Sequence, residues 1–450
     1  MNRKRCFPFV LLCLAFLGSF FVACHKDPES GRMLSGYQIE LRSGDGQTDT
    51  IGNTLKKEIV FKVSKNNSTT FTGFVQIETS DCDEQPRKVD YPIERRIYPP
   101  GYEMLISHSW KLNATVGTQT LKAVLLDSLR VPQDSAIVTA TGLAPGKGWH
   151  PSGCIDDRNF AYSFTELPSG RILVAVHDPG YPYYSDDGGI SWHALKTFPG
   201  GHRIKKIIAT STNEVFLSTE DQGIHYSPDG GQTWQLRSSG FPLNAYNGAF
   251  YYTKSGKLFV STITGVYLSH DKGVNWHLAG NGLPFYASFW DAFSLPNGRI
   301  IALSNRTLVT SVDGGENWRD VYTLSVTANP SAAFADDNGN VFVGLSGNIG
   351  MSDGLYRSDS TMQTWTRVYS VLPPPNFDNQ ISGISSQNGN YYFYASSKNF
   401  LISTNNFTNY TLLDPQVKDL NGRVSFRYIV PKSNRVIVST EFFGIYYYIP

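Results

Sequence analysis

The chain has 450 residues, and its 39 basic and 38 acidic side chains give a formal net charge of +1. That balance excludes the strong electrostatic field that draws a protein to nucleic acid or to an acidic surface, so we expect no nucleic-acid partner. The aromatic content of 13%, the 41 glycines and the 24 prolines, without a long stretch of helical period, favour an all-β fold.

Residues 1–23 have the pattern of a signal peptide. Basic residues at positions 3–5 precede an apolar run from Phe7 to Val22, which is too short for a transmembrane helix and ends in small residues. The sequence Phe21-Val22-Ala23-Cys24 resembles a bacterial lipobox, with phenylalanine in place of the usual leucine. The resemblance implies that Cys24 is the lipid-attached first residue of the mature protein. The alternative is an ordinary secretory signal followed by an incidental cysteine.

Residues 24–35 are polar, and with Pro28 and Gly31 they are typical of a tether. Acyl chains on one residue hold a protein at a bilayer, because each buried methylene adds to the anchoring free energy. Asp27 and Glu29 are similar to the acidic export signal of surface lipoproteins in Bacteroidetes-type bacteria. We therefore expect a bacterial cell-envelope protein, on the periplasmic side of the outer membrane or at the cell surface, that touches the membrane through its anchor alone.

Two of the five cysteines remain free to pair. Cys6 and Cys13 leave with the signal and Cys24 carries the anchor, so Cys82 and Cys154 are left. An exported compartment permits a disulfide between them, which would link the two domains predicted below. Two lone thiols are the alternative.

Residues 36–144 are predicted to form a small β-sandwich. Runs of alternating polarity at 37–41, 58–63, 73–77, 120–126 and 135–140 are separated by turn residues. About seven strands in roughly a hundred residues is typical of an immunoglobulin-like domain. Trp110 is the expected core aromatic.

Residues 145–450 are organised by a repeated motif, Ser-x-Asp-x-Gly-x-x-Trp. Its first serines lie 42, 42, 42, 47 and 45 residues apart, and a period in the forties with strand-like flanks predicts propeller blades. The four intact copies and the two altered ones are Ser185-Asp187-Gly189-Trp192, Ser227-Asp229-Gly231-Trp234, Ser269-Asp271-Gly273-Trp276, Ser311-Asp313-Gly315-Trp318, Ser358-Ser360-Met362-Trp365 and Ser403-Asn405-Phe407-Tyr410.

The motif resembles the Asp-box, or BNR repeat, of sialidases, sortilin-type receptors, xyloglucanases and photosystem assembly factors. That resemblance implies a β-propeller, but it does not select a function, because these families mix enzymes with binding proteins. A short acid in a tight turn accepts backbone N–H groups, glycine supplies a positive φ and tryptophan buries a large ring. We therefore expect Asp187, Asp229, Asp271 and Asp313 to brace turns and to take no part in a reaction.

The chain contains seven repeat units, and the last one is incomplete. Residues 435–440 and 444–448 match the second and third strands of a blade, but no box and no fourth strand follow. An open blade would leave a bare edge, which proteins avoid. We predict a seven-bladed propeller in which the segment 148–151 supplies the missing outer strand and brings Trp149 close to Tyr446.

The boxes and the first hairpin of each unit are expected on one face, and ligand binding on the other. The loops of that second face are rich in aromatic residues, whose flat rings stack on sugars or pack between blades. The aromatic residues are Phe198, Phe241, Tyr246, Phe285, Tyr286, Phe289, Trp290, Tyr369 and Phe377. Tyr246, Tyr286, Trp290 and Asp291 are our candidate ligand-binding residues.

Acidic residues near the same face leave a glycoside hydrolase open as an alternative. Hydrolysis needs two carboxyl groups that flank the bond, and sequence does not show which acids converge. The candidates are Asp156, Asp157, Asp178, Glu220, Asp221, Asp291, Asp353, Asp378 and Glu441. No Arg-Ile-Pro motif occurs in the repeats, which argues against a sialidase, and the xyloglucanase type uses a cleft between two propellers whereas one is present here.

The sequence predicts neither a metal site nor a cofactor. His150, His177, His202 and His225 lie in different units without ligand spacing, and residues 336–340 are more simply a hairpin than a calcium loop. The most favoured function is recognition of a glycan or a protein partner. A glycoside hydrolase is the first alternative, and an assembly or scaffold factor is the second.

Overall fold

The computed structural model describes residues 37–65, 72–79, 87–93, 103–153, 155, 161–176, 180–242, 247–253, 255–283, 289, 291–303, 307–323, 328–347, 354–369, 381–395, 399–413, 426–429, 435–440 and 444–450. The predicted signal peptide and tether, Cys24, Cys82 and Cys154 lie outside these ranges. The described residues form strands and connecting turns, so the fold is all-β. None of the described segments is a helix of the length and apolarity needed to span a membrane.

The N-terminal region is a sandwich of two sheets. One sheet has the strand order β1-β3-β6 and the other has the order β2-β8-β7-β4-β5, with β2 parallel to β8 and the other pairs antiparallel. The strands are β1 (Tyr37–Ser43), β2 (Gln47–Thr50), β3 (Ile59–Lys65), β4 (Gly73–Thr79), β5 (Arg87–Ile93), β6 (Glu103–His108), β7 (Gly117–Asp127) and β8 (Pro132–Leu143). All five runs predicted from alternating polarity are strands, whereas β2, β5 and β6 had no such signal.

One apolar core lies between these two sheets. Phe61 of β3, Ile77 of β4 and Leu121 of β7 are almost fully buried in it. Trp110 is 3% exposed in the same core, which confirms it as the core aromatic.

The rest of the described chain forms seven four-stranded sheets, each built from consecutive strands except the last. Their strands, in sheet order, are β10 (Ala161–Glu166), β11 (Ile172–Val176), β12 (Pro182–Ser185), β13 (His193–Ala194); β14 (Ile204–Ala209), β15 (Val215–Thr219), β16 (Gly223–Ser227), β17 (Gln235–Leu236); β18 (Asn247–Tyr252), β19 (Leu258–Thr262), β20 (Gly265–Ser269), β21 (His277–Ala279); β22 (Asp291–Ser294), β23 (Ile300–Leu303), β24 (Thr307–Ser311), β25 (Arg319–Thr323); β26 (Ala328–Ala335), β27 (Val341–Gly347), β28 (Gly354–Ser358), β29 (Thr366–Tyr369); β30 (Ile381–Gln387), β31 (Asn390–Ala395), β32 (Asn399–Ser403), β33 (Thr411–Leu413); β34 (Phe426–Ile429), β35 (Ile437–Thr440), β36 (Gly444–Ile449) and β9 (Gly148–Pro151).

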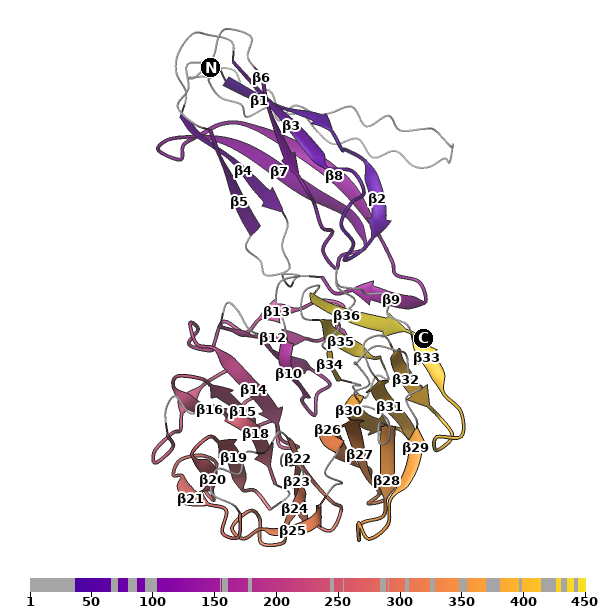
Figure 1. Cartoon of the computed structure of the whole chain (residues 1–450). Coiled ribbons are helices and arrows are strands. Elements are labelled where there is room, and N and C mark those ends of the chain that lie inside the picture. The colour runs from indigo at the N-terminus through magenta and orange to yellow at the C-terminus, as the bar shows by residue number, and fades with distance from the viewer. Residues whose placement is uncertain are drawn as a thin grey trace, which may run out of the picture.

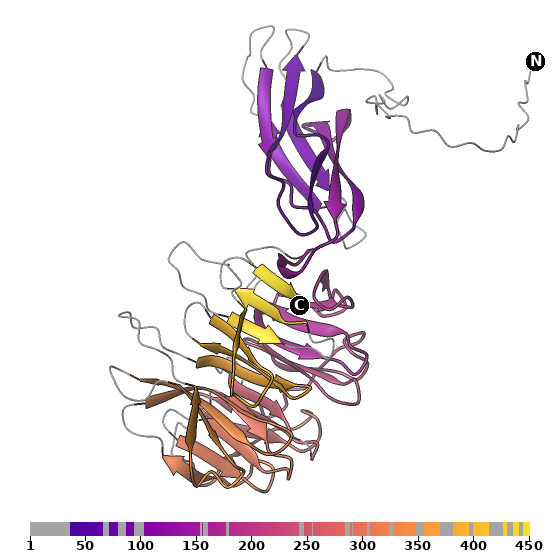
Figure 2. The same cartoon turned by 90° about the vertical axis from the view of Figure 1, so that its right-hand side faces the viewer.

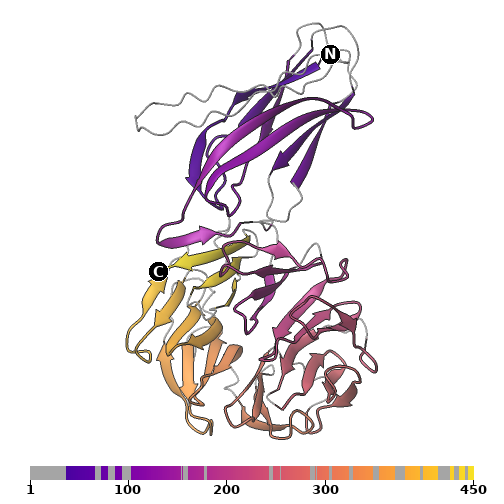
Figure 3. The same cartoon turned by 180° about the vertical axis from the view of Figure 1, so that it is seen from behind.

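The seven small sheets follow one another around a common centre. The first strand of each sheet neighbours the first strand of the next, from β10 through β14, β18, β22, β26 and β30 to β34, and β34 lies against β10. Figures 1 and 3 show this arrangement from opposite sides. The fold is therefore propeller-like, with the N-terminal sandwich projecting from its rim beside β9 and β36 (Figure 2).

The strand β9 completes the last sheet, as predicted. It pairs antiparallel with β36, Trp149 lies opposite Tyr448 and Pro151 lies opposite Tyr446. The Trp149 ring also packs on Phe400 of the preceding sheet, with the ring centroids 6.2 Å apart. The N-terminal end of the repeat region thus covers the edge that β36 would otherwise expose.

The sandwich and the ring meet at close backbone contacts. A Cβ atom on Gly52 would lie 2.2 Å from the carbonyl oxygen of Pro151, and one on Gly153 would lie 3.0 Å from the backbone nitrogen of Ala114. Gly52 also has a φ of +80°, which favours glycine. Glycine at these positions lets the end of the sandwich sit directly on β9.

Each intact box is a turn closed by its own side chains. In the fourth box, the buried Ser311 hydroxyl accepts from the backbone N–H of Gly315 and donates to Asp313 at 2.8 Å. Asp313 in turn accepts from the backbone N–H of Asn317 at 3.0 Å and from its side-chain amide at 2.7 Å. The Trp318 indole N–H then donates to the Gly315 carbonyl. The acid, the serine, the glycine and the tryptophan are linked in one hydrogen-bonded unit.

The altered boxes keep the turn by other means. Met362 and Phe407 stand at the glycine position and retain positive φ angles of 58° and 68°. Both side chains are buried in the cores between sheets, and this burial offsets the strain of the left-handed backbone. Asn405 replaces the acid of the sixth box and still accepts from the backbone N–H of Asn409 at 2.9 Å.

The first, third and fourth boxes also fasten their sheets to the chain that precedes them. The backbone N–H of Trp318 donates to the Asn281 carbonyl, and that of Trp276 donates to the Ser239 carbonyl. A Cβ atom on the next residue, Gly282, would lie 2.2 Å from the carbonyl oxygen of Trp318. The close approach explains why glycine follows Asn281.

Candidate binding site

The predicted ligand-binding residues are described only in part. Tyr246, Tyr286 and Trp290 lie outside the described residues, as do Asp156, Asp157, Asp178, Asp353, Asp378 and Glu441 among the candidate acids. Asp291 is the first residue of β22, is partly buried, and its Oδ1 accepts from the backbone N–H of Ala292 at 3.0 Å. Glu220 and Asp221 are the other described candidates.

The strand register places Glu220 and Asp221 on the face opposite the boxes. In the second sheet Ile204, at the start of β14, pairs with Thr219, at the end of β15. Val215, at the other end of β15, pairs with Ser227 of the box. The loop after Thr219 therefore lies at the end of the sheet away from the box turn, where binding was predicted.

At this end of the sheet two histidines and an aspartate form a cluster. His202 Nδ1 lies 2.8 Å from Asp221 Oδ2, with the Asp221 side chain 49% exposed. The His225 ring stacks on His202 at a centroid distance of 6.2 Å and meets the buried Phe198 ring edge-on at 5.0 Å. The pair with Asp221 orients His202 and leaves Nε2 as the second polar atom of its ring.

A second set of polar side chains lies beside this cluster. Glu220 Oε2 is 3.4 Å from Lys205 Nζ and 3.8 Å from Arg203 Nη1. Lys205 also lies over the Tyr162 ring, 5.4 Å from its centroid. Acidic, basic, imidazole and aromatic groups are thus gathered at the start of β14, and together with the His202–Asp221 cluster we call them the β14 patch.

The ionisation states in the patch follow from burial and pairing. Burial, followed by the nearby charge of His202, lowers the pKa of His225 to about 4, so His225 is neutral at pH 7. Burial would raise the pKa of Asp221, but the hydrogen bonds from His202 and from a backbone N–H, together with the neighbouring imidazoles, outweigh it and the pKa lies below its ordinary value. Asp221 is therefore a carboxylate at pH 7 that is hydrogen-bonded to His202.

Several of the aromatic residues predicted on this face pack inside the fold. Phe198, Phe241 and Phe289 are at most 6% exposed. They contact Trp234, Trp276 and Trp318, the tryptophans of the boxes that follow them, with centroid distances of 5.2, 5.3 and 5.0 Å. Tyr369 packs in the same way on Tyr410 of the sixth box, at 5.2 Å. These rings fill the space between sheets.

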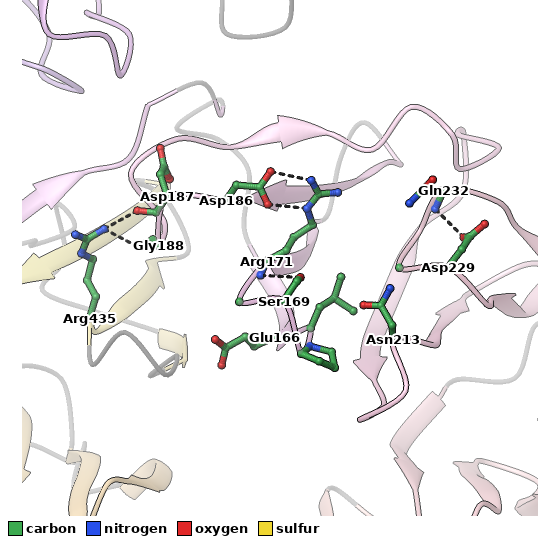
Figure 4. Close-up of a pocket in the computed structure, with 14 residues that line it drawn as sticks. Glu166, Ser169, Arg171, Asp186, Asp187, Gly188, Asn213, Asp229, Gln232 and Arg435 are labelled. Carbon is green, nitrogen blue, oxygen red and sulfur yellow. Dashed lines mark hydrogen bonds and ion pairs between the residues drawn. The ribbon is translucent and has the colours of Figure 1, made fainter.

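The box face carries a groove of about 800 Å³ between the first two sheets. It is lined by the β10–β11 turn, by the turns of the first two boxes and by Arg435, as Figure 4 shows. A groove on this face is at variance with the expectation that the opposite face would carry the binding surface. Whether the groove can bind a ligand depends on whether its polar groups are already bonded within the protein.

Most charges in the groove serve the fold. Arg171 makes two hydrogen bonds with Asp186, at 2.7 and 2.8 Å (Figure 4), and stacks on Tyr184. Arg435 donates to the carbonyls of Asp187 and Gly188, at 2.6 and 3.2 Å. Asp187 and Asp229 accept from the hydroxyl and N–H groups of their own turns. A ligand would have to replace these bonds, so the groove is a weaker candidate than the β14 patch.

The box turns predict how stability changes at low pH. In Asp229, Asp271 and Asp313 burial would raise the pKa, but bonds from the turn outweigh it, and the pKa of Asp313 falls to about 2. Such a carboxyl group has a lower pKa in the folded protein than in the unfolded chain, where the pKa is about 3.9. Its contribution to stability is fully present at a pH above the unfolded-state pKa, and it is lost as the pH falls through the folded-state pKa. We expect the melting temperature to decline between about pH 4 and pH 2.

The contribution of one box is measured with Asp313→Asn, in thermal melts from pH 2 to pH 7. Asparagine does not titrate, and Asn405 shows that it can keep the bond to the backbone N–H of the turn. The variant should melt slightly below the natural protein at pH 7 and show a shallower acid decline. An acid profile identical to that of the natural protein would contradict this role of the carboxylate.

Comparisons with known proteins agree with the propeller-like fold. A model of the BNR/Asp-box repeat matches residues 183–194, which contain the first box. A xyloglucanase from Paenibacillus sp. is 34% identical over 86 residues, which are 17% of this chain and 8% of that protein. The chain thus spans a small part of the length of this relative.

Several solved structures have the same fold. YCF48 from Cyanidioschyzon merolae is 14% identical and covers 67% of this chain and 99% of its own, with a TM-score of 0.52. An extracellular domain from B. thetaiotaomicron, described as part of a hybrid two-component system, is 12% identical with a TM-score of 0.53 and covers 67% of this chain and 40% of its own. The GH74 xyloglucanase from Xanthomonas campestris is 14% identical with a TM-score of 0.50 and covers 67% of this chain and 53% of its own. At these identities the likeness establishes the β-propeller fold alone.

Proposed function

We propose that this chain is an exported, lipid-anchored binding protein that recognises a glycan or a protein partner on the propeller face opposite the boxes. In this proposal Cys24 carries the lipid and 24–35 is the tether. An immunoglobulin-like sandwich then holds a closed seven-bladed propeller away from the membrane. The ring of first strands and the closure by β9 support this architecture. The extracellular domain and the xyloglucanase among the structural neighbours are in keeping with a location in the cell envelope.

The observation that carries the proposal is the different use of charge on the two faces. On the box face Arg435 and the box aspartates are bonded to backbone groups of the turns that build the propeller. In the β14 patch, Asp221 is half exposed and His202 is held in one orientation by a single partner atom. Oriented polar groups beside an aromatic ring suit hydroxyl groups and amides of a ligand.

The box aspartates are structural in this proposal. Asp187, Asp229, Asp271 and Asp313 each accept a backbone N–H four residues further on. The four carboxylates lie in the turns of four different sheets, so each stabilises one turn. Tyr246, Tyr286 and Trp290 remain proposed ligand contacts, with Asp291, on the same face as the β14 patch.

The proposal is tested by comparing two carboxylates on opposite faces. Asp221→Asn weakens the hold on His202 in the β14 patch, whereas Asp186→Asn breaks a similarly exposed ion pair with Arg171 in the groove. Binding is first measured on a glycan array that includes xyloglucan oligosaccharides, then by titration of the best probe. We expect Asp221→Asn to weaken binding by about tenfold or more, the equivalent of 1.4 kcal/mol, with Asp186→Asn unchanged. The reverse order would place the ligand in the groove.

A glycoside hydrolase is the second candidate, favoured by the short match to a xyloglucanase. A hydrolase of this kind needs a general acid whose pKa is raised. Among the described residues, each carboxyl group with a shifted pKa is shifted downward, including Glu214, Asp221 and Glu316. A lowered pKa keeps these carboxyl groups ionised, which favours ligand binding over proton donation at these positions. The hydrolase would be supported if the natural protein released reducing ends from xyloglucan and if substitution of a single acidic loop residue abolished this release.

A further inference from the structure

Two histidines and a glutamate converge where the third and fourth sheets meet. His270 is the second residue of the third box, His277 follows the tryptophan of that box, and Glu316 lies in the fourth box. His270 Nε2 is 2.6 Å from Glu316 Oε1, and His277 Nε2 is 3.3 Å from Glu316 Oε2. The three groups therefore present two imidazole nitrogens and a carboxylate toward one point, with their ligand atoms within 4.8 Å of one another.

The backbone holds these three side chains in place. His277 belongs to β21 and lies opposite Leu268 of β20, so it is fixed one strand away from the box that carries His270. The two imidazole rings are parallel to within 9°, with their centroids 5.4 Å apart. On the side of the fourth sheet, the carbonyl oxygen of Glu316 accepts hydrogen bonds from the backbone N–H groups of Gly280 and Asn281. The chain that follows β21 is thereby tied to the residue that supplies the carboxylate.

We propose that His270, His277 and Glu316 form a binding site for a divalent transition-metal ion such as Zn²⁺. Two imidazoles and one carboxylate are a ligand set that zinc uses when a fourth position stays open to water or to another ligand. Hard ions such as Ca²⁺ and Mg²⁺ prefer six or more oxygen ligands, which this group does not provide. The two histidine side chains are 49% and 48% exposed and Glu316 is 29% exposed, so an ion can reach the site from solvent.

The three residues occupy positions that vary among the repeats. The residue after the first serine is aspartate in the first box, proline in the second and valine in the fourth. The position of Glu316 is taken by Ile190, Gln232 and Val274 in the other intact boxes. The combination of two histidines and an acid therefore occurs where the third and fourth sheets meet and is absent from the other intact boxes. The geometry of the turn does not require it. A bound ion would bridge the third and fourth sheets from outside, in addition to the hydrogen bonds that join them.

The proposal departs from the expectation that the chain has no metal site. That expectation considered His150, His177, His202 and His225, which lie in different units without ligand spacing. Here the third ligand comes from the next repeat, 39 residues after His277. Spacing within one segment does not reveal a site that is completed by a neighbouring blade.

The test uses the whole mature protein, stripped with a chelator and titrated with Zn²⁺ by calorimetry, with Co²⁺ absorption as a second readout. The natural protein should bind one equivalent, give the visible absorption of a four-coordinate Co²⁺ site, and melt at a higher temperature as Zn²⁺ is added. His270→Ala, His277→Ala and Glu316→Gln should each weaken Zn²⁺ binding by about tenfold or more and remove the Co²⁺ absorption. His193→Ala is the matched control, because His193 follows the tryptophan of the first box as His277 follows that of the third.

Melting curves in chelator show whether each variant is folded without metal, so that loss of binding is separated from loss of structure. Binding that is equal in the natural protein and in all three ligand variants would overturn the proposal, as would the absence of Zn²⁺ binding by the natural protein. Half an equivalent of Zn²⁺ together with dimer formation in sedimentation would also overturn it, since the ion would then be shared between two molecules.

Discussion

Replacing Trp318 with alanine is expected to lower the free energy of unfolding of the propeller by about 3 to 5 kcal/mol, the usual cost of removing a buried aromatic side chain. Trp318 is 4% exposed and its ring contacts Phe259 at 5.7 Å and Phe289 at 5.0 Å. Its indole N–H also donates to Gly315. The substitution would leave a cavity between the third and fourth sheets and an unpaired carbonyl in the box, and denaturant unfolding followed by circular dichroism measures the loss.

Trp318→Phe is the matched control for this prediction. Phenylalanine keeps most of the ring volume but has no indole N–H, and the sixth box shows with Tyr410 that a smaller ring is accepted at this position. The loss should be about 1 to 2 kcal/mol, close to that of one hydrogen bond with some packing. A loss below about 1 kcal/mol for alanine would mean that the box tryptophans contribute little to the contact between sheets.

Removing β9 is expected to have the second large effect. A fragment of residues 155–450 lacks this strand and leaves β36 as an exposed edge, whereas a fragment of residues 146–450 keeps it. We expect the shorter fragment to aggregate, or to melt about 10 °C or more below the longer one, because it loses a strand pair and the packing of Trp149 on Phe400 and Tyr448. Thermal melts and sedimentation compare the two fragments.

The longer fragment is the control in this comparison. Both fragments lack the sandwich, so a difference between them is due to residues 146–154 and not to the loss of that domain. Equal melting temperatures and equal monomer fractions would show that the ring does not depend on β9. Failure of both fragments would show that the contacts with the sandwich are needed to hold β9 in place.

The candidate sites could be predicted only in part. Sequence periodicity placed Glu220 and Asp221 on the face opposite the boxes, but it gave no sign that Asp221 pairs with His202, 19 residues earlier. It left open whether Phe198 and Phe289 stack on a ligand or pack between blades, and the structure buries both against tryptophans of the next box. His270, His277 and Glu316 had no motif of their own.

The sequence by itself determined the repeat, the order of the strands within each repeat unit and the closure by β9. These features depend on local chemistry, since a serine, an acid, a glycine and a tryptophan at fixed spacing close one turn wherever they occur. The tertiary structure alone decided which rings are buried and which polar groups meet. Those contacts join side chains that lie 19 to 46 residues apart in the chain. They depend on how the sheets and their loops pack around the ring and on no pattern within one repeat.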